Sequence, residues 1–78
     1  MKAWLIRSTT MSNHYFYGLN FDGNGRCIGS TWGNKEFGTG LFKGESFDHA
    51  NGWAHTLRLS KHECEVVHEE VPDGSTSR

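Results

Sequence analysis

Long apolar runs are missing from this sequence. The segment KAWLIR at residues 2–7 is the apolar stretch nearest the start. It is much shorter than the apolar region of a signal peptide or of a membrane-spanning helix. We therefore expect a cytoplasmic protein with no membrane partner.

The sequence also has little net charge. Its 8 basic and 9 acidic residues give a formal charge of −1. Proteins that bind nucleic acid through its phosphates carry a basic face, so this composition disfavours direct nucleic-acid binding. Several of the carboxylates cluster near the C-terminus, at Glu63, Glu65, Glu69, Glu70 and Asp73. This clustering predicts one acidic edge on a protein of nearly neutral charge.

Cysteine is scarce, with only Cys27 and Cys64. Without an export signal, reduced thiols are the expected state. We expect both cysteines to act as small buried hydrophobic residues, because free cysteine is among the most buried residue types.

Aliphatic residues are few, so aromatic rings, 13% of the chain, must form most of the core. A chain of 78 residues has enough apolar surface for one domain only. A core of this size gives a net stability of only about 3–5 kcal/mol without further support. A docked partner or a homodimer is therefore expected.

The first half of the chain predicts three strands. Residues 2–8 are short and apolar, and residues 14–21 alternate strictly, with Tyr15, Tyr17, Leu19 and Phe21 on one face. The sequence DGNG at 22–25 favours positive φ and predicts a tight turn, so we expect a hairpin that joins residues 14–21 to 26–32.

The same DGNG also resembles the opening of a calcium-binding loop. Arg26 occupies a ligand position of that motif, and Gly33 stands where the closing glutamate belongs. The turn is therefore the favoured interpretation.

Residues 33–46 carry four glycines and predict a flexible loop, with a short edge strand at 36–42. The spacing of the glycines does not match a phosphate-binding loop. Phe37, Leu41 and Phe42 either cover the core or form a binding surface.

One helix follows, with Ser46 or Asp48 as its N-cap. Ala50, Trp53, Ala54 and Leu57 have the i, i+3, i+4, i+7 spacing of an apolar stripe that packs on a sheet. A glycine inside a helix costs about 1 kcal/mol relative to alanine, so Gly52 suggests close approach to a neighbouring backbone.

Residues 62–71 return to a period of two and predict a last strand, and residues 72–78 predict a disordered polar tail. The fold class is therefore α+β: an antiparallel sheet of three to four strands with one helix packed across one face, in the order β-β-β-α-β. Residues 1–71 form the single domain.

The segment HECEVVHEE at 62–70 raises the question of a metal site. In a strand, His62 and His68 lie roughly 20 Å apart and cannot share an ion. Only His62 and Cys64 are close enough, and they would need Cys27 and His14 as further ligands. The second short-spaced ligand pair of typical zinc sites is missing, so we predict no metal and no cofactor.

Catalysis is also disfavoured. Glu63 and Glu65 lie about 7 Å apart along a strand, which suits paired-carboxylate chemistry, but so short a chain offers little room for a substrate cleft. No Ser/His/Asp or Cys/His spacing suggests a nucleophile. We predict that the protein is not an enzyme and has no catalytic residues.

Surface binding remains. We predict a protein-binding module that docks through its acidic strand and its exposed aromatic residues. The residues predicted to bind the partner are Glu63, Glu65, Glu69, Glu70, Tyr15, Tyr17, Phe37 and Phe42. The glutamates would meet lysines or arginines, so the partner is a host protein or nucleoprotein complex with a basic surface. The alternatives are a small metal-binding domain, or a single-stranded nucleic-acid-binding domain that stacks bases on His14, Tyr15, Phe16 or Tyr17.

The arrangement of a hairpin, the segment SFDHANGWAHTL and an acidic last strand resembles small bacteriophage-encoded accessory proteins, among them anti-CRISPR proteins. The resemblance covers the organisation of residues 14–71. It implies a non-catalytic inhibitor that acts in the host cytoplasm on a CRISPR effector complex, often by blocking a nucleic-acid-binding surface.

Overall fold

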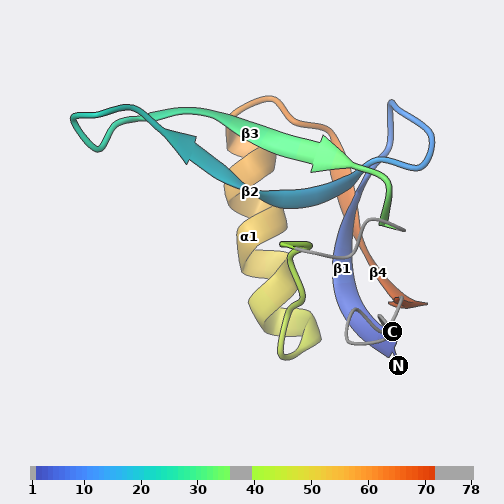
Figure 1. Cartoon of the computed structure of the whole chain (residues 1–78). Helices are drawn as coiled ribbons and strands as arrows, with labels where there is room; N and C mark the ends of the chain where they lie inside the picture. The colour runs from blue at the N-terminus through green and yellow to red at the C-terminus, as the bar shows by residue number, and fades with distance from the viewer. Residues whose placement is uncertain (1, 36–39, 72–78) are drawn as a thin grey trace, which may run out of the picture.

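The computed structural model describes residues 2–35 and 40–71. These residues form one antiparallel sheet with strand order β3-β2-β1-β4 and one helix (Figure 1). The elements are β1 (Lys2–Ser8), β2 (Tyr15–Phe21), β3 (Cys27–Gly33), α1 (Phe47–Leu59) and β4 (Cys64–Glu70). The predicted α+β class and the order β-β-β-α-β are confirmed.

Strands β1 and β4 pair along their full length, from Lys2 opposite Glu70 to Ser8 opposite Cys64. Helix α1 packs across this pair, because packing there removes its apolar stripe from water. Ile6 of β1 and Leu57 of α1 are buried in the resulting core, which confirms the predicted stripe.

Helix α1 begins after Ser46. Of the two residues proposed as the N-cap, Ser46 is therefore the one that the structure shows. Its side-chain oxygen accepts a hydrogen bond from the His49 N–H, one of the N–H groups that the first turn leaves unpaired. The chain leaves the helix through Lys61, whose φ of 70° lies in the left-handed region. The backbone N–H groups of Lys61 and His62 then donate back to carbonyls of the last turn.

Strands β1 and β2 diverge soon after they meet. Their register contains one residue pair, Arg7 with Tyr15. The segment 41–44 enters the space between them: the Phe42 N–H donates to the Phe16 carbonyl at 3.1 Å, and the Gly44 N–H donates to the Trp4 carbonyl at 2.8 Å.

The segment 41–44 also links the two faces of the sheet. Leu41 is buried with Leu5 on the face away from the helix, and Phe42 packs on the helix side. The predicted edge strand at 36–42 is corrected here: its described part, residues 40–42, forms no strand and acts as an insert between two strands. The rest of that prediction lies outside the described residues.

The close approach predicted at Gly52 is wrong, because no atom of a neighbouring element lies within 4 Å of where a Cβ on that residue would stand among the described residues. The tight glycine is Gly44. A Cβ there would lie 2.9 Å from the Cβ of Ala50, closer than two carbon atoms can pack. The absence of a side chain at Gly44 therefore allows the insert to lie against the start of the helix.

Strands β2 and β3 form the predicted hairpin, with its turn at DGNG. The carboxylate of Asp22 accepts hydrogen bonds from the N–H groups of Asn24 and Arg26, at 2.8 and 3.0 Å. Gly25 adopts a φ of 82°, which glycine tolerates without strain. The turn interpretation is confirmed.

The predicted strict alternation along β2 is wrong. The register of β2 against β3 shifts between Phe16 and Gly18, so one extra residue of β2 is accommodated. As a result Tyr15 and Tyr17 pack on the face away from the helix, whereas Leu19 packs on the helix side.

The outer part of this hairpin extends past the helix (Figure 1). β3 and β4 are the two edge strands of the sheet. The predicted disordered tail at 72–78 lies outside the described residues.

Candidate functional site

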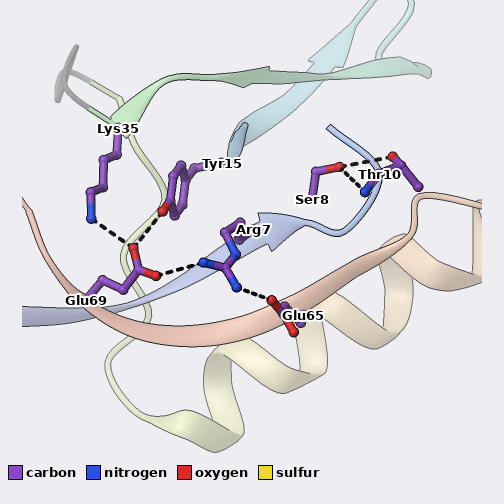
Figure 2. Close-up of polar contacts among 7 residues, drawn as sticks. All are labelled: Arg7, Ser8, Thr10, Tyr15, Lys35, Glu65 and Glu69. Atoms are coloured by element: carbon purple, nitrogen blue, oxygen red, sulfur yellow. Dashed lines mark hydrogen bonds and ion pairs between the residues drawn. The ribbon is translucent and has the colours of Figure 1, made fainter. Parts of the chain in front are cut away.

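Two of the glutamates predicted to bind a partner lie on the sheet face away from the helix, one on each side of Arg7 (Figure 2). The Arg7 guanidinium donates to Glu65 through one nitrogen and to Glu69 through the other, the second at 3.2 Å. Cross-strand pairing brings these residues together, because Arg7 lies opposite Glu65 in the register of β1 and β4.

Glu69 is the centre of this network. Its carboxylate also accepts hydrogen bonds from the Lys35 ammonium at 2.8 Å and the Tyr15 hydroxyl at 2.6 Å. The bond from Lys35, followed by the bond from Tyr15, lowers the pKa of Glu69 below its usual value. Burial, followed by the bond to Glu69, raises the pKa of Tyr15. Glu69 is therefore held ionised and is balanced by basic neighbours.

The other two predicted glutamates are placed differently. Glu63 precedes β4 and is exposed, and Glu70 is exposed at the end of β4. Strand alternation directs Glu70 to the face opposite that of Glu65 and Glu69. The four side chains therefore do not form one continuous acidic row.

Of the four aromatic residues predicted to contact a partner, the structure buries one and half-buries two. Tyr15 is 5% exposed. Tyr17 is half-buried: its hydroxyl donates to the Asn34 carbonyl, and its ring lies next to the Cα positions of Gly33 and Gly40. Phe42 is half-buried against the rings of the helix-side core. Phe37 lies outside the described residues.

Two of the four residues proposed for base stacking are buried. Phe16 is 1% exposed and, like Tyr15, is part of the core, so neither ring offers a face to a nucleobase. His14 stands in the loop before β2, where its Nδ1 lies 2.7 Å from the Ser12 carbonyl. Tyr15 and Phe16 are therefore not available as stacking rings for the nucleic-acid alternative.

The four candidate metal ligands do not converge. Across residues 2–35 and 40–71, no three His, Cys, Asp or Glu side chains lie close enough together to hold an ion. Cys64 is buried, as predicted, and burial raises the pKa of its thiol. Cys27 is exposed at the start of β3, so its predicted burial is wrong.

One serine and histidine pair was not anticipated from the sequence. Ser30 Oγ lies 3.4 Å from His62 Nε2, at the edge of a hollow of about 280 Å³. The Ser30 oxygen also accepts a bond from the Trp32 indole N–H at 2.7 Å. Among the described residues, no carboxylate is bonded to His62 to orient it as a base, so the pair lacks the third member of a nucleophilic triad.

A mostly apolar depression lies between helix α1 and strand β2. Its volume is about 510 Å³. It is lined by Leu19, Asp48, His49, Gly52, Trp53 and Thr56. Among the described residues that line the depression, Asp48 carries a full negative charge, and none is a lysine or an arginine.

Two large apolar side chains are exposed farther out on the hairpin. Phe21 is 58% exposed and Ile28 is 66% exposed. Phe21 follows Leu19 by two residues in β2, so strand alternation places both on the helix side of the sheet. We call Leu19, Phe21, Ile28 and Trp53 the hairpin surface.

Sequence reasoning missed the hairpin surface because it depends on the register shift. Gly18 carries the signal that was available, since a glycine inside a strand often marks a bulge. A bulge beside Gly18 reverses the side to which Leu19 and Phe21 point.

Comparison with known proteins gives no match to a protein family, to a curated protein or to a solved structure. Within residues 2–35 and 40–71, no helix is long and apolar enough to cross a membrane.

Proposed function

We propose that this protein is a small non-catalytic protein-binding module that docks on its target through the hairpin surface. The observation that carries the proposal is the exposure of Phe21 and Ile28 on a two-stranded ribbon beyond the helix. Exposed large apolar residues beside a depression mark interaction sites, because leaving them in water has a free-energy cost that a partner removes.

The partner that fits is a protein with an apolar side chain flanked by lysine or arginine. The apolar side chain would enter the depression beside Trp53. The basic groups would meet Asp48 and the neighbouring Glu45, both exposed near the start of the helix. Such a partner agrees with the host protein or nucleoprotein complex expected from the resemblance to phage-encoded inhibitors, whose nucleic-acid-binding surfaces are basic.

The acidic strand makes a weaker docking surface than the hairpin. Glu65 and Glu69 already neutralise Arg7 and Lys35, so a partner would have to compete for them. Docking through Glu63 and Glu70 stays a prediction, and the same experiment tests it.

The experiment compares matched surface substitutions in a pull-down from bacterial lysate, followed by titration of each purified captured protein. The hairpin variant is Phe21→Ser with Ile28→Ser. Its control is Leu59→Ser, which removes a side chain that is 72% exposed at the far end of the helix. A third variant, Glu63→Lys with Glu70→Lys, reverses the charge of the acidic strand.

We expect the hairpin variant to weaken binding at least about tenfold, equivalent to about 1.4 kcal/mol, while Leu59→Ser binds as the wild type does. If the lysine variant alone loses binding, the docking surface is the acidic strand and not the hairpin. If nuclease treatment abolishes capture, or if no protein is captured, the proposed function is overturned.

A further inference from the structure

Asparagine followed by glycine occurs twice in the chain, as Asn24–Gly25 in the turn of the hairpin and as Asn51–Gly52 inside helix α1. All four residues are exposed. Because glycine has no side chain to shield its backbone nitrogen, this nitrogen can attack the side-chain amide of a preceding asparagine when the backbone lets the two groups meet. The two pairs have the same chemistry and the same exposure, so the local backbone decides which of them reacts.

We propose that Asn24 is a site of spontaneous modification, at which the asparagine deamidates through a cyclic imide, while Asn51 stays intact. The Gly25 backbone nitrogen forms a bond to the side-chain carbonyl carbon of Asn24 and gives its proton to solvent, and the side-chain nitrogen leaves as ammonia. Water then opens the imide at one of its two carbonyl groups, which yields aspartate or isoaspartate. The inference goes beyond the proposed function and does not depend on it.

The turn holds the peptide group between Asn24 and Gly25 loosely. The Gly25 N–H donates one hydrogen bond, to the Asp22 carbonyl at 3.1 Å. The N–H groups on either side, of Asn24 and Arg26, donate instead to the Asp22 carboxylate, at 2.8 and 3.0 Å. Since glycine tolerates φ of either sign, this peptide group can rotate while its neighbours keep their bonds. The rotation breaks one hydrogen bond and brings the Gly25 nitrogen toward the side chain of Asn24.

Helix α1 prevents the same approach at Gly52. A helical N–H group donates to the carbonyl four residues earlier, which for Gly52 is that of Asp48. Rotation of the peptide group between Asn51 and Gly52 breaks this bond and also forces both residues out of helical φ and ψ, so the turns on either side open with it. The interior of a helix therefore opens at a higher free energy than an exposed turn does.

Deamidation changes the turn through charge and through chain length. Aspartate at position 24 places a second negative charge beside the Asp22 carboxylate, which repels it. Isoaspartate carries the main chain through its side-chain carbon, so it lengthens a turn whose length sets the register of the two strands. The first residue pair beyond the turn, Phe21 with Cys27, is therefore the pair that we expect to change. Only the effect of this change on docking rests on the proposed function.

The first test incubates the full chain at physiological temperature and mildly alkaline pH. Tryptic peptides separate Asn24 from Asn51, and mass spectrometry detects replacement of each amide by a carboxyl group. We expect Asn24 to be modified at least about tenfold faster than Asn51 in the folded protein. In urea that unfolds the chain the two rates should become similar, because the same residue pair then has no fixed backbone.

The matched variants are Asn24→Gln and Asn51→Gln. Glutamine keeps the amide, but its longer side chain closes an imide ring more slowly. Labelling by an isoaspartyl methyltransferase should therefore be lost in Asn24→Gln and kept in Asn51→Gln, and circular dichroism verifies that both variants are folded. In NMR spectra of the aged wild-type protein, the amide signals of Phe21 and Cys27 should shift while those of β1 and β4 stay in place.

Four results would overturn the inference: an Asn24 that keeps its amide, equal rates at the two sites in the folded protein, a difference in rate that persists in urea, or labelling that survives Asn24→Gln. Unchanged Phe21 and Cys27 signals in the modified protein would overturn the expected effect on the hairpin. None of these results affects the proposed function, because capture of a target by freshly purified, unmodified protein tests that function separately.

Discussion

The β1–β4 pair and the β2–β3 hairpin are built from strands of equal length but differ in what supports them. The β1–β4 pair has an unbroken register, a helix across one face and an ion-pair network on the other. The hairpin has two register shifts, and it joins β1 through one residue pair and the segment 41–44. The β1–β4 pair is therefore supported on both faces, whereas the outer part of the hairpin presents surface.

This division explains why large apolar residues appear in both places. Ile6 is fully buried under the helix, whereas Ile28 is 66% exposed on the hairpin. A residue on the outer part of the hairpin, such as Ile28, contributes little to the core and can therefore serve recognition at little cost to folding.

Substitution of Ile6 and of Ile28 tests the difference between the two regions with the largest expected effect on the free energy of unfolding. We expect Ile6→Ala to lower the free energy of unfolding by about 2–4 kcal/mol, through lost burial and the cavity left behind. Ile28→Ala should change it by no more than about 0.5 kcal/mol, as is usual at exposed sites. Urea denaturation of both variants at low protein concentration gives the two values. Similar losses would mean that the outer part of the hairpin also contributes to the core.

Substitution of Gly44, beside the helix, and of Gly52, within it, gives the next largest effects, and these have opposite signs. Gly44→Ala should destabilise the fold by about 1–3 kcal/mol, because the added Cβ meets Ala50 at 2.9 Å. Gly52→Ala should stabilise it by about 0.5–1 kcal/mol, since that site is open and alanine favours the helix. Thermal unfolding of both variants measures the difference. A stable Gly44→Ala protein would contradict the tight fit of segment 41–44.

Lowering the pH tests the ion-pair network around Glu69 on the β1–β4 pair. Because the pKa of Glu69 is lowered in the folded state, its contribution is present above the ordinary value of 4.5 and is lost as pH falls through the lowered folded value. We expect Glu69→Gln to cost about 1–2 kcal/mol at neutral pH and progressively less below about pH 4.5, measured by urea denaturation at each pH.

Glu63→Gln, on an exposed residue outside the network, is the control for that titration. It should change stability by no more than about 0.5 kcal/mol across the range. A constant difference between wild type and Glu69→Gln would show that the carboxylate charge contributes nothing to folding.

The fold was predictable because its signals are local. The i, i+3, i+4 stripe of Ala50, Trp53 and Ala54, the N-cap at Ser46 and the DGNG turn each depend on neighbouring residues, and each lies where the sequence predicted. Residue spacing alone determines such features.

The candidate site was less predictable because it depends on pairing between distant residues. The extra residue in β2 can be located only once β3 lies beside it, and it decides the side to which Leu19 and Phe21 point. The same is true of Glu69, whose partners Arg7 and Lys35 lie 62 and 34 residues away. Two of the glutamates that the sequence suggested as an acidic row, Glu65 and Glu69, are therefore paired with basic residues in the fold.

The pairing of β1 with β4 also constrains the order of assembly. Lys2 lies opposite Glu70, so the ladder of the first strand with the last can form only after β4 is made, whereas only the five residues 22–26 separate the two strands of the hairpin. On a translating ribosome, the strands of the part that we propose for recognition are therefore available for pairing first. The part that stabilises it follows only when the ribosome has released β4.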